Sequence, residues 1–153
     1  MIKLIHYRTL LVLLAAVSAV FFLSQFMVVR VQENSMQPTL SDGQWALVWK
    51  GAEVHSGDIA VFISPDDEEP AVKRCVLSAG EQPRIQHGWL ITPWGNWFLT
   101  ESEWRNLAQS SFSSENFYFM VGDNQFHSLD SRQYGYIARD RILGKVLLGK
   151  SYD

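Results

Sequence analysis

The pattern of apolar positions divides the chain into one long uncharged segment and a body of short apolar runs. No charged residue occurs from Thr9 to Val29. A helix of that length, at about 1.5 Å per residue, would span roughly 30 Å, which matches the hydrocarbon core of a bilayer. A cleavable secretory signal is the alternative, but its apolar region usually covers only about 7–15 residues. Because apolar side chains continue to Val29, the pattern favours a retained membrane anchor.

Beyond this segment the apolar runs are short and bounded by turn residues, which is typical of β-strands. Gly57-Asp58 indicates a turn, and the acidic stretch Ser64–Pro70 indicates a solvated loop. Helical periodicity is nearly absent after the anchor, so the sequence predicts a mostly β fold behind a single N-terminal transmembrane helix. We expect strands just after residue 30 and at 45–49, 59–63, 71–77, 117–121 and 139–148.

A chain of 153 residues suffices for one globular domain. We assign residues 1–30 to a cytoplasmic N-terminus with the anchor, and residues 31–153 to one extracytoplasmic domain. Within that domain, residues 82–115 form a Trp-rich insert, because His87–Trp104 holds four of the six tryptophans. Core packing and contact with lipid headgroups both explain such tryptophans, and the sequence does not choose between them.

The distribution of charge bears on orientation and partners. Lys3 and Arg8 precede the span, whereas Arg30 is the only basic residue between the span and Lys50, so the positive-inside rule places the N-terminus in the cytoplasm. All sixteen acidic residues but only eleven of the thirteen basic ones lie beyond the span. This acidic surface argues against nucleic acid as a partner and favours a peptide. The single cysteine, Cys75, excludes an internal disulfide.

The residues that could catalyse a reaction are few. A serine hydroxyl needs a positioned base, but none of His6, His55, His87 and His127 accompanies a serine in a Gly-x-Ser-x-Gly motif. A lysine can act as the base if burial lowers its pKa. Lys73 lies in a mostly apolar strand, which makes it a candidate. A single lysine in a strand nevertheless usually points to solvent, so this pattern alone does not identify a base.

Four segments of the chain, in order and behind a membrane span, resemble the conserved blocks of bacterial type I signal peptidases. Residues 34–40 resemble the Ser-Met-x-Pro-Thr-Leu motif around the family's nucleophile, and residues 57–62 resemble the next block. Residues 72–74 resemble the Lys-Arg block with the general base. Residues 122–135 resemble the Gly-Asp-Asn…Ser-x-Asp-Ser-Arg-x-x-Gly block. Roughly residues 82–115 are unmatched.

This resemblance implies a signal-peptidase-like β-sheet catalytic domain and a serine endopeptidase of the bacterial plasma membrane. Ser35 would be the nucleophile, and Lys73 would take its proton and return it to the leaving amine. Ser128 matches the family serine that orients the lysine amine. The implied substrates are the signal peptides of exported preproteins, cut after a small-x-small motif. Membrane lipid is a further expected partner, and no cofactor or metal is expected.

The resemblance also implies how the site is supported. The Ser35 backbone N–H would stabilise the oxyanion, whereas Glu33 departs from the serine or glycine that family members have two residues before the nucleophile, and we expect its carboxylate to point away. Two further sets of residues follow. The substrate pockets would be walled by Val31, Met36, Leu40 and Val72. An ion-pair network holding the 122–135 segment against the lysine strand would include Arg74, Asp123, Asp130 and Arg132, although the sequence does not give the pairs.

Four alternatives remain open at this stage. A specialised peptidase for one exported or conjugative protein would use the same residues. Self-cleaving repressors of the DNA-damage response share the Ser–Lys chemistry, but they are soluble and bind DNA. An inactive membrane-anchored peptide-binding module predicts a broken dyad or a missing lysine-orienting serine, whereas Ser35, Lys73 and Ser128 are all present. A Ser–His–Asp hydrolase would use His127 in place of Lys73.

Overall fold

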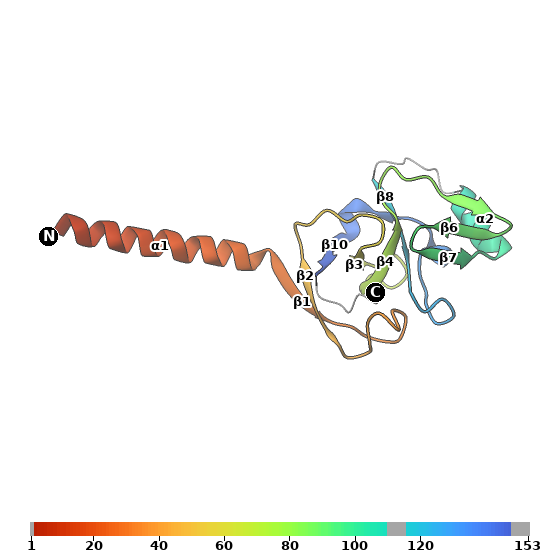
Figure 1. Cartoon of the computed structure of the whole chain (residues 1–153), viewed down its shortest axis with the longest axis horizontal. Coiled ribbons are helices and arrows are strands. Elements are labelled where there is room, and N and C mark those ends of the chain that lie inside the picture. Colours follow the sequence, from red (N-terminus) through yellow and green to blue (C-terminus); the bar gives the residue numbers. More distant parts are fainter. Residues whose placement is uncertain (1, 110–115, 148–153) are drawn as a thin grey trace.

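The apolar N-terminal segment forms helix α1 (Ile2–Ser24) in the computed structural model, which describes residues 2–109 and 116–147. The window Tyr7–Ser24 has a mean hydropathy of 1.9 and is not buried against the rest of the chain, so it is long and apolar enough to cross a membrane. Figure 1 shows α1 projecting away from the body of the molecule.

The helix ends earlier than the apolar pattern predicted. Residues that we assigned to the anchor form strand β1 (Phe26–Arg30), which pairs antiparallel with β2 (Trp45–Trp49) from Phe26↔Trp49 to Arg30↔Trp45. The expectation of a helix reaching Val29, with the first strand only after residue 30, is therefore wrong. β-Branched and aromatic residues suit a strand as well as a membrane helix, and here the hydrogen bonds to β2 decide between the two.

The body is built on a seven-stranded antiparallel sheet in the order β1-β2-β10-β3-β4-β8-β9. The strands predicted at 45–49, 59–63 and 117–121 are confirmed, and the one predicted from residue 71 begins at Pro70. The last strand starts at Ile142 rather than at Arg139, because Arg139–Arg141 forms a turn of 3-10 helix, and Leu148 lies outside the described residues. The remaining elements are β3 (Ile59–Ile63), β4 (Pro70–Leu77), β8 (Phe117–Val121), α3 (Ser131–Tyr134), β9 (Ile137–Ala138) and β10 (Ile142–Val146).

Both faces of this sheet are covered around β3. Ala60 and Phe62 belong to one buried cluster, whereas Val61 between them belongs to another, as expected for side chains that alternate along a strand. The second cluster includes Val31, Met36 and Leu40 from the loop between β1 and β2. This packing fixes that loop, which carries Ser35, against the face of the sheet.

The Trp-rich insert contributes a second, three-stranded sheet and a helix. Its strands are β5 (Arg84–Gln86), β6 (Trp89–Thr92) and β7 (Gly95–Phe98), followed by α2 (Glu101–Gln109). A capping box starts α2, since Thr100 Oγ1 accepts from Glu103 N and Glu103 Oε2 accepts from Thr100 N. The sequence pattern did not predict this helix, because it is short and mostly polar. Residues 110–115 of the insert lie outside the described residues.

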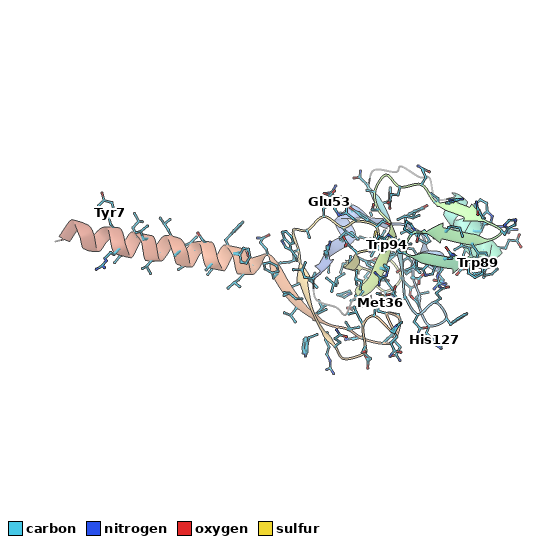
Figure 2. All side chains as sticks on the ribbon, viewed as in Figure 1. Tyr7, Met36, Glu53, Trp89, Trp94 and His127 are labelled. Carbon is cyan, nitrogen blue, oxygen red and sulfur yellow. The ribbon has the colours of Figure 1, made fainter. Side chains whose placement is uncertain are left out.

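The tryptophans of the insert differ in their burial. Trp97 is buried in a cluster with Leu90 and Leu99 of the insert and side chains of β4 and β8, which confirms core packing for this residue. Trp89 is exposed, and Figure 2 shows it at the opposite end of the molecule from Tyr7 of α1. This placement does not favour the headgroup interpretation for Trp89.

The side of the main sheet next to α1 exposes an apolar surface. Cross-strand partners share a face of an antiparallel pair. Of the residues on this face, Val28, Trp45 and Trp49 are 60%, 66% and 43% exposed. We call it the outer β1–β2 face, and it comprises Phe26, Val28, Arg30, Trp45, Leu47 and Trp49.

Candidate active site

The structure brings Ser35 and Lys73 together although 38 residues separate them. Lys73 Nζ lies 2.7 Å from Ser35 Oγ and donates a hydrogen bond to it. Ser35 comes from the loop between β1 and β2. Lys73 belongs to β4 and lies opposite Ala60 of β3. Both residues are buried, with exposed fractions of 5% and 7%. Lys73 therefore does not point to solvent, as an average lysine in a strand would.

The surroundings of Lys73 shift its pKa in opposing directions. Burial of the amine is the largest influence and lowers the pKa below its ordinary value. The negative charges of Asp130 and Glu33 raise the pKa, and the positive charge of Arg132 lowers it. The net effect is a lowered pKa, which increases the fraction of neutral amine. A neutral amine at this position can accept the proton of the Ser35 hydroxyl.

Asp130 organises the loop that approaches the two residues. This carboxylate is fully buried and pairs with the Arg132 guanidinium through two contacts of 2.9 Å. It also accepts hydrogen bonds from Ser128 Oγ at 2.7 Å and from Gly122 N at 2.9 Å. As the N-cap of α3, it forms a capping box with Gln133. One carboxylate therefore fixes the loop, the helix and the Ser128 hydroxyl.

Ser128 lies close to the dyad, but its described hydrogen bond is to Asp130 and not to the lysine amine. A Cβ atom added at Gly122 would lie 2.6 Å from both Ser128 Cβ and the Ser35 carbonyl oxygen, so these two residues approach Gly122 closely. Donation of the Ser128 proton to Asp130 leaves its oxygen as an acceptor. Its role in orienting Lys73 remains a prediction.

A second ion pair joins the loop to the strand that carries Lys73. Arg74 donates to Asp123 through Nε at 2.8 Å and Nη2 at 2.6 Å, and this hydrogen bonding is the main reason why the pKa of Arg74 is raised. Thr39 Oγ1 also donates to Asp123. The four charged residues expected in the network thus form the pairs Arg74–Asp123 and Arg132–Asp130.

The loop is also tied to the segment with the nucleophile. Asn124 N donates to the Ser35 carbonyl at 3.0 Å, and its side-chain amide donates to the Asn34 carbonyl at 3.1 Å. The sequence analysis did not single out Asn124, Thr39 or Gly122. Their position inside the segments that resemble the family blocks was the signal that could have identified them as functional residues.

Glu33 has an unusual backbone conformation. Its φ is +66°, a left-handed conformation uncommon for this residue type, and its N–H donates to Asp42 Oδ1 at 2.9 Å. Glu33 borders the same cleft as Ser35 and Lys73, and its negative charge raises the pKa of Lys73. That its carboxylate points away from the oxyanion stays a prediction.

A cleft of about 780 Å³ opens at Ser35 and Lys73. The segment from Val29 to Glu33 and the start of β4 from Pro70 to Lys73 both border it. Val31 and Val72 line the cleft as predicted for pocket walls. Met36 and Leu40 are fully buried in the core cluster that includes Val31, so they support the cleft from behind.

His127 does not fit the role of a catalytic base. Its side chain is exposed and it is not among the residues that line the cleft. Figure 2 shows it at the periphery of the body. A Ser–His arrangement with Ser35 is therefore not formed in this structure.

Comparisons with known proteins show which family this chain resembles. The family model described as "Signal peptidase, peptidase S26" matches residues 1–149. The chain is 27% identical to signal peptidase I V of Bacillus subtilis (strain 168) over 138 residues, covering 76% of this chain and 81% of that protein. It is 26% identical to signal peptidase IB of Staphylococcus aureus (strain Mu50 / ATCC 700699) over 152 residues, covering 82% and 79%.

A solved structure of a signal peptidase I from Enterococcus faecalis V583 is also similar to this chain. It is 24% identical and superimposes with a TM-score of 0.44, covering 63% of this chain and 98% of that one.

Proposed function

Because this chain belongs to the signal peptidase family, peptidase S26, we propose that it is a membrane-anchored serine endopeptidase that cleaves N-terminal signal peptides from exported preproteins. The observation that carries this proposal is the 2.7 Å hydrogen bond between Lys73 Nζ and Ser35 Oγ inside a buried site that opens on a cleft. A nucleophile and a base within hydrogen-bonding reach are what covalent peptide hydrolysis requires.

The proposed reaction has two stages. Neutral Lys73 takes the Ser35 proton while Ser35 Oγ attacks the scissile carbonyl carbon, which gives a tetrahedral intermediate. Lys73 then returns the proton to the leaving amine as the peptide bond breaks, and an acyl-enzyme remains on Ser35. In the second stage Lys73 takes a proton from water as the water oxygen attacks the ester carbon. The bond from that carbon to Ser35 Oγ then breaks, Lys73 returns the proton to Ser35 Oγ, and the signal peptide is released with a new carboxyl end.

The residues around the dyad have supporting roles in this proposal. Ser128, held by Asp130, would accept a hydrogen bond from the lysine amine and direct the amine toward Ser35 Oγ. This does for lysine what the aspartate does for histidine in a Ser–His–Asp triad. The Ser35 backbone N–H is the proposed oxyanion donor.

The cleft suits an extended peptide. Its two borders include the end of β1 at Val29–Arg30 and the start of β4 at 70–73, and the backbones of these strand segments can pair with a substrate strand. Val31 and Val72 then limit the size of the substrate side chains that enter, which favours small residues and the small-x-small motif. Whether the enzyme processes many preproteins or one dedicated preprotein depends on the substrate side chains that contact this cleft.

Membrane lipid is the second partner that we propose. α1 is long and apolar enough to span a bilayer, and the outer β1–β2 face begins two residues after the helix ends. The excess of positive charge before the span supports an N-terminus in the cytoplasm and a catalytic domain outside.

The proposal is tested with the full chain in detergent and a preprotein whose signal peptide ends in a small-x-small motif. Ser35→Ala and Lys73→Met are each expected to lower kcat/KM at least about 10³-fold, because each removes one member of the dyad. Ser41→Ala and Lys50→Met, which change exposed residues of the same types, are the matched controls and should retain wild-type activity.

The pH profile provides an independent check. Lys73 acts only when neutral, so activity should fall as the pH drops through its lowered pKa. Normal processing by either dyad variant, or a flat profile down to about pH 5, would contradict the mechanism. Binding of the preprotein without cleavage by the wild type would instead identify an inactive peptide-binding module.

A further inference from the structure

The Trp-rich insert lies outside the blocks that carry the family resemblance, yet it contacts the segments that hold the dyad. Among the described residues, three side-chain hydrogen bonds connect it to the catalytic core. They are Trp94 Nε1 to Ser56 Oγ at 2.9 Å, Gln125 Nε2 to Asn96 O at 3.0 Å, and Gln133 Nε2 to Glu103 Oε1 at 2.7 Å.

Trp94 also packs against the core through its indole ring. Trp94 occupies the turn between β6 and β7, and its ring lies flat against Gly57. A Cβ atom at Gly57 would lie 2.5, 2.6 and 2.8 Å from three atoms of the indole, and Gly57 has φ +96°. Only glycine allows this approach at this backbone conformation. Trp94 and Gly57 therefore hold each other in place.

Gly57 in turn holds the residue next to the base. Its carbonyl accepts a hydrogen bond from Arg74 Nη1 at 2.7 Å, and its N–H donates to the Cys75 carbonyl at 2.8 Å. Arg74 uses its other nitrogens to bind Asp123 of the 122–135 loop. Trp94 thus packs on the peptide that fixes the strand on the C-terminal side of Lys73.

The other two contacts lead to Asp130. Gln125 uses its amide to bind the insert, and its carbonyl accepts from Arg132 Nη2 at 3.0 Å. Gln133 donates to Glu103 of α2, and its side-chain oxygen accepts from Asp130 N at 2.9 Å. Arg132 and Asp130 form the buried ion pair beside the dyad.

We infer that the insert is a positioning lobe for the dyad and that Trp94 is its main positioning residue, acting through Gly57 and Arg74 on the strand that carries Lys73. This inference rests on the proposed function, because it assigns a part in that reaction to residues outside the matched blocks. Trp94 does not touch the reacting atoms.

The exposure of Trp94 separates this role from ordinary core packing. Its side chain is 53% exposed, whereas the core of the insert is made by Leu90, Trp97 and Leu99. Truncation of Trp94 therefore removes little buried surface from that core. The main consequence of truncating Trp94 is that Gly57 and Arg74 become less restrained in their positions.

This loss of restraint has a predicted effect on Lys73. The charged groups that act on its amine are Glu33 from the nucleophile loop and Asp130 and Arg132 from the 122–135 loop, while Arg74 is its neighbour in β4. A looser Gly57–Arg74–Asp123 connection admits water to the amine and weakens the desolvation that lowers its pKa. The pKa of Lys73 should then rise, and the acid limb of the activity profile should move to higher pH.

The experiment compares Trp94→Ala, Trp94→Phe and Trp89→Ala in the full chain in detergent. Trp94→Ala is expected to lower kcat on the order of 10- to 100-fold, with a smaller change in KM, because the dyad loses alignment more than the cleft loses shape. Trp94→Phe keeps an aromatic ring on Gly57 and should restore most of the activity. Trp89→Ala, an exposed tryptophan of the same small sheet packed on Phe98, is the matched control and should leave kcat unchanged.

A second readout needs no substrate. Competitive acetylation of Lys73 by acetic anhydride across pH, measured by mass spectrometry, gives the titration of the amine directly. Trp94→Ala should move this titration to higher pH, and Trp94→Phe should not. If wild-type protein fails to cleave preproteins while the titration still shifts, the proposed function is wrong and the positioning role stands. If wild-type protein cleaves and Trp94→Ala changes neither kcat nor the Lys73 titration, or if Trp89→Ala has the same effect, the positioning role is wrong.

Discussion

Lys73, Glu33 and Ser35 border the same cleft. Burial lowers the pKa of Lys73, and the negative charges of Asp130 and Glu33 partly oppose that effect. Asp130 is neutralised locally by Arg132, at 2.9 Å, whereas the described contact of Glu33 is a backbone hydrogen bond to Asp42. At the residue scale, Glu33 is therefore the negative charge whose removal disturbs the site least.

Replacement of Glu33 by glutamine is expected to lower the pKa of Lys73 further. The positively charged amine loses a favourable interaction, so less of it stays protonated at a given pH. Because neutral Lys73 is the active form, the acid limb of kcat/KM against pH should move to lower pH, and the activity at mildly acidic pH should rise. Glu53→Gln, an exposed change of the same type, is the control. An acid limb that stays in place or moves to higher pH would contradict this assignment.

The loop from Gly122 to Gly135 is the element that brings the separate parts of the site together. Asp123 binds β4 through Arg74, Asn124 binds the Ser35 loop, and Asp130 fixes both Ser128 and the start of α3. Gly122 is the first residue of this loop, directly after β8. A side chain at this position would collide with Ser128 and the Ser35 carbonyl. The close approach of these segments depends on the absence of a Cβ atom at this position.

Gly122→Ala is therefore expected to separate Ser128 from the Ser35 segment. A forced methyl group in a packed site costs about 1–3 kcal/mol of stability, and the displacement of the dyad should lower kcat on the order of 100-fold. Thermal unfolding and preprotein cleavage measure the two effects. Gly51→Ala, where the added atom would make only ordinary contacts at 3.5 Å, is the control. Full activity and an unchanged melting temperature for Gly122→Ala would show that the loop can move without cost.

At the scale of the whole molecule, the helix, the outer β1–β2 face and the cleft follow one another along the chain. α1 ends at Ser24, the exposed apolar face starts at Phe26, and the border of the cleft starts at Val29. Figure 1 shows the insert at the end of the body away from α1. Along the chain, the border of the cleft is therefore closer to α1 than the insert is, which suits the proposed access of a signal peptide from the membrane to Ser35.

The outer β1–β2 face should contact the bilayer surface through Trp45 and Trp49. In vesicles of neutral brominated lipid, the full chain is expected to lose tryptophan fluorescence, and Trp45→Phe/Trp49→Phe should remove most of the quenchable signal. Because the body is acidic and the contact is apolar, added salt should not weaken the quenching. Trp104→Phe, in the insert, is the control and should retain the quenchable signal. Equal quenching of the double variant and the wild type would contradict this membrane contact.

The sequence by itself determined the features that depend on local patterns. The apolar N-terminal segment predicted the membrane-length helix, and the runs at 45–49, 59–63 and 117–121 predicted the strands β2, β3 and β8, because side-chain periodicity is a local property. The order of the four blocks also selected Ser35 and Lys73 as a pair. Apolarity did not locate the end of α1, because the same residue types suit a membrane helix and a strand.

The tertiary structure decided everything that depends on residues distant in sequence. Arg74 pairs with Asp123 across 49 positions, and the sequence offered Asp130 as an equal choice. Trp94 meets Gly57 only because the insert folds back on the start of β3, and Ser128 meets Asp130 and Gly122 only through the fold of one loop. The local burial of Lys73 likewise depends on strands that pack on both sides of β4. Seven strands in an order different from the sequence create these contacts, so no local pattern encodes them.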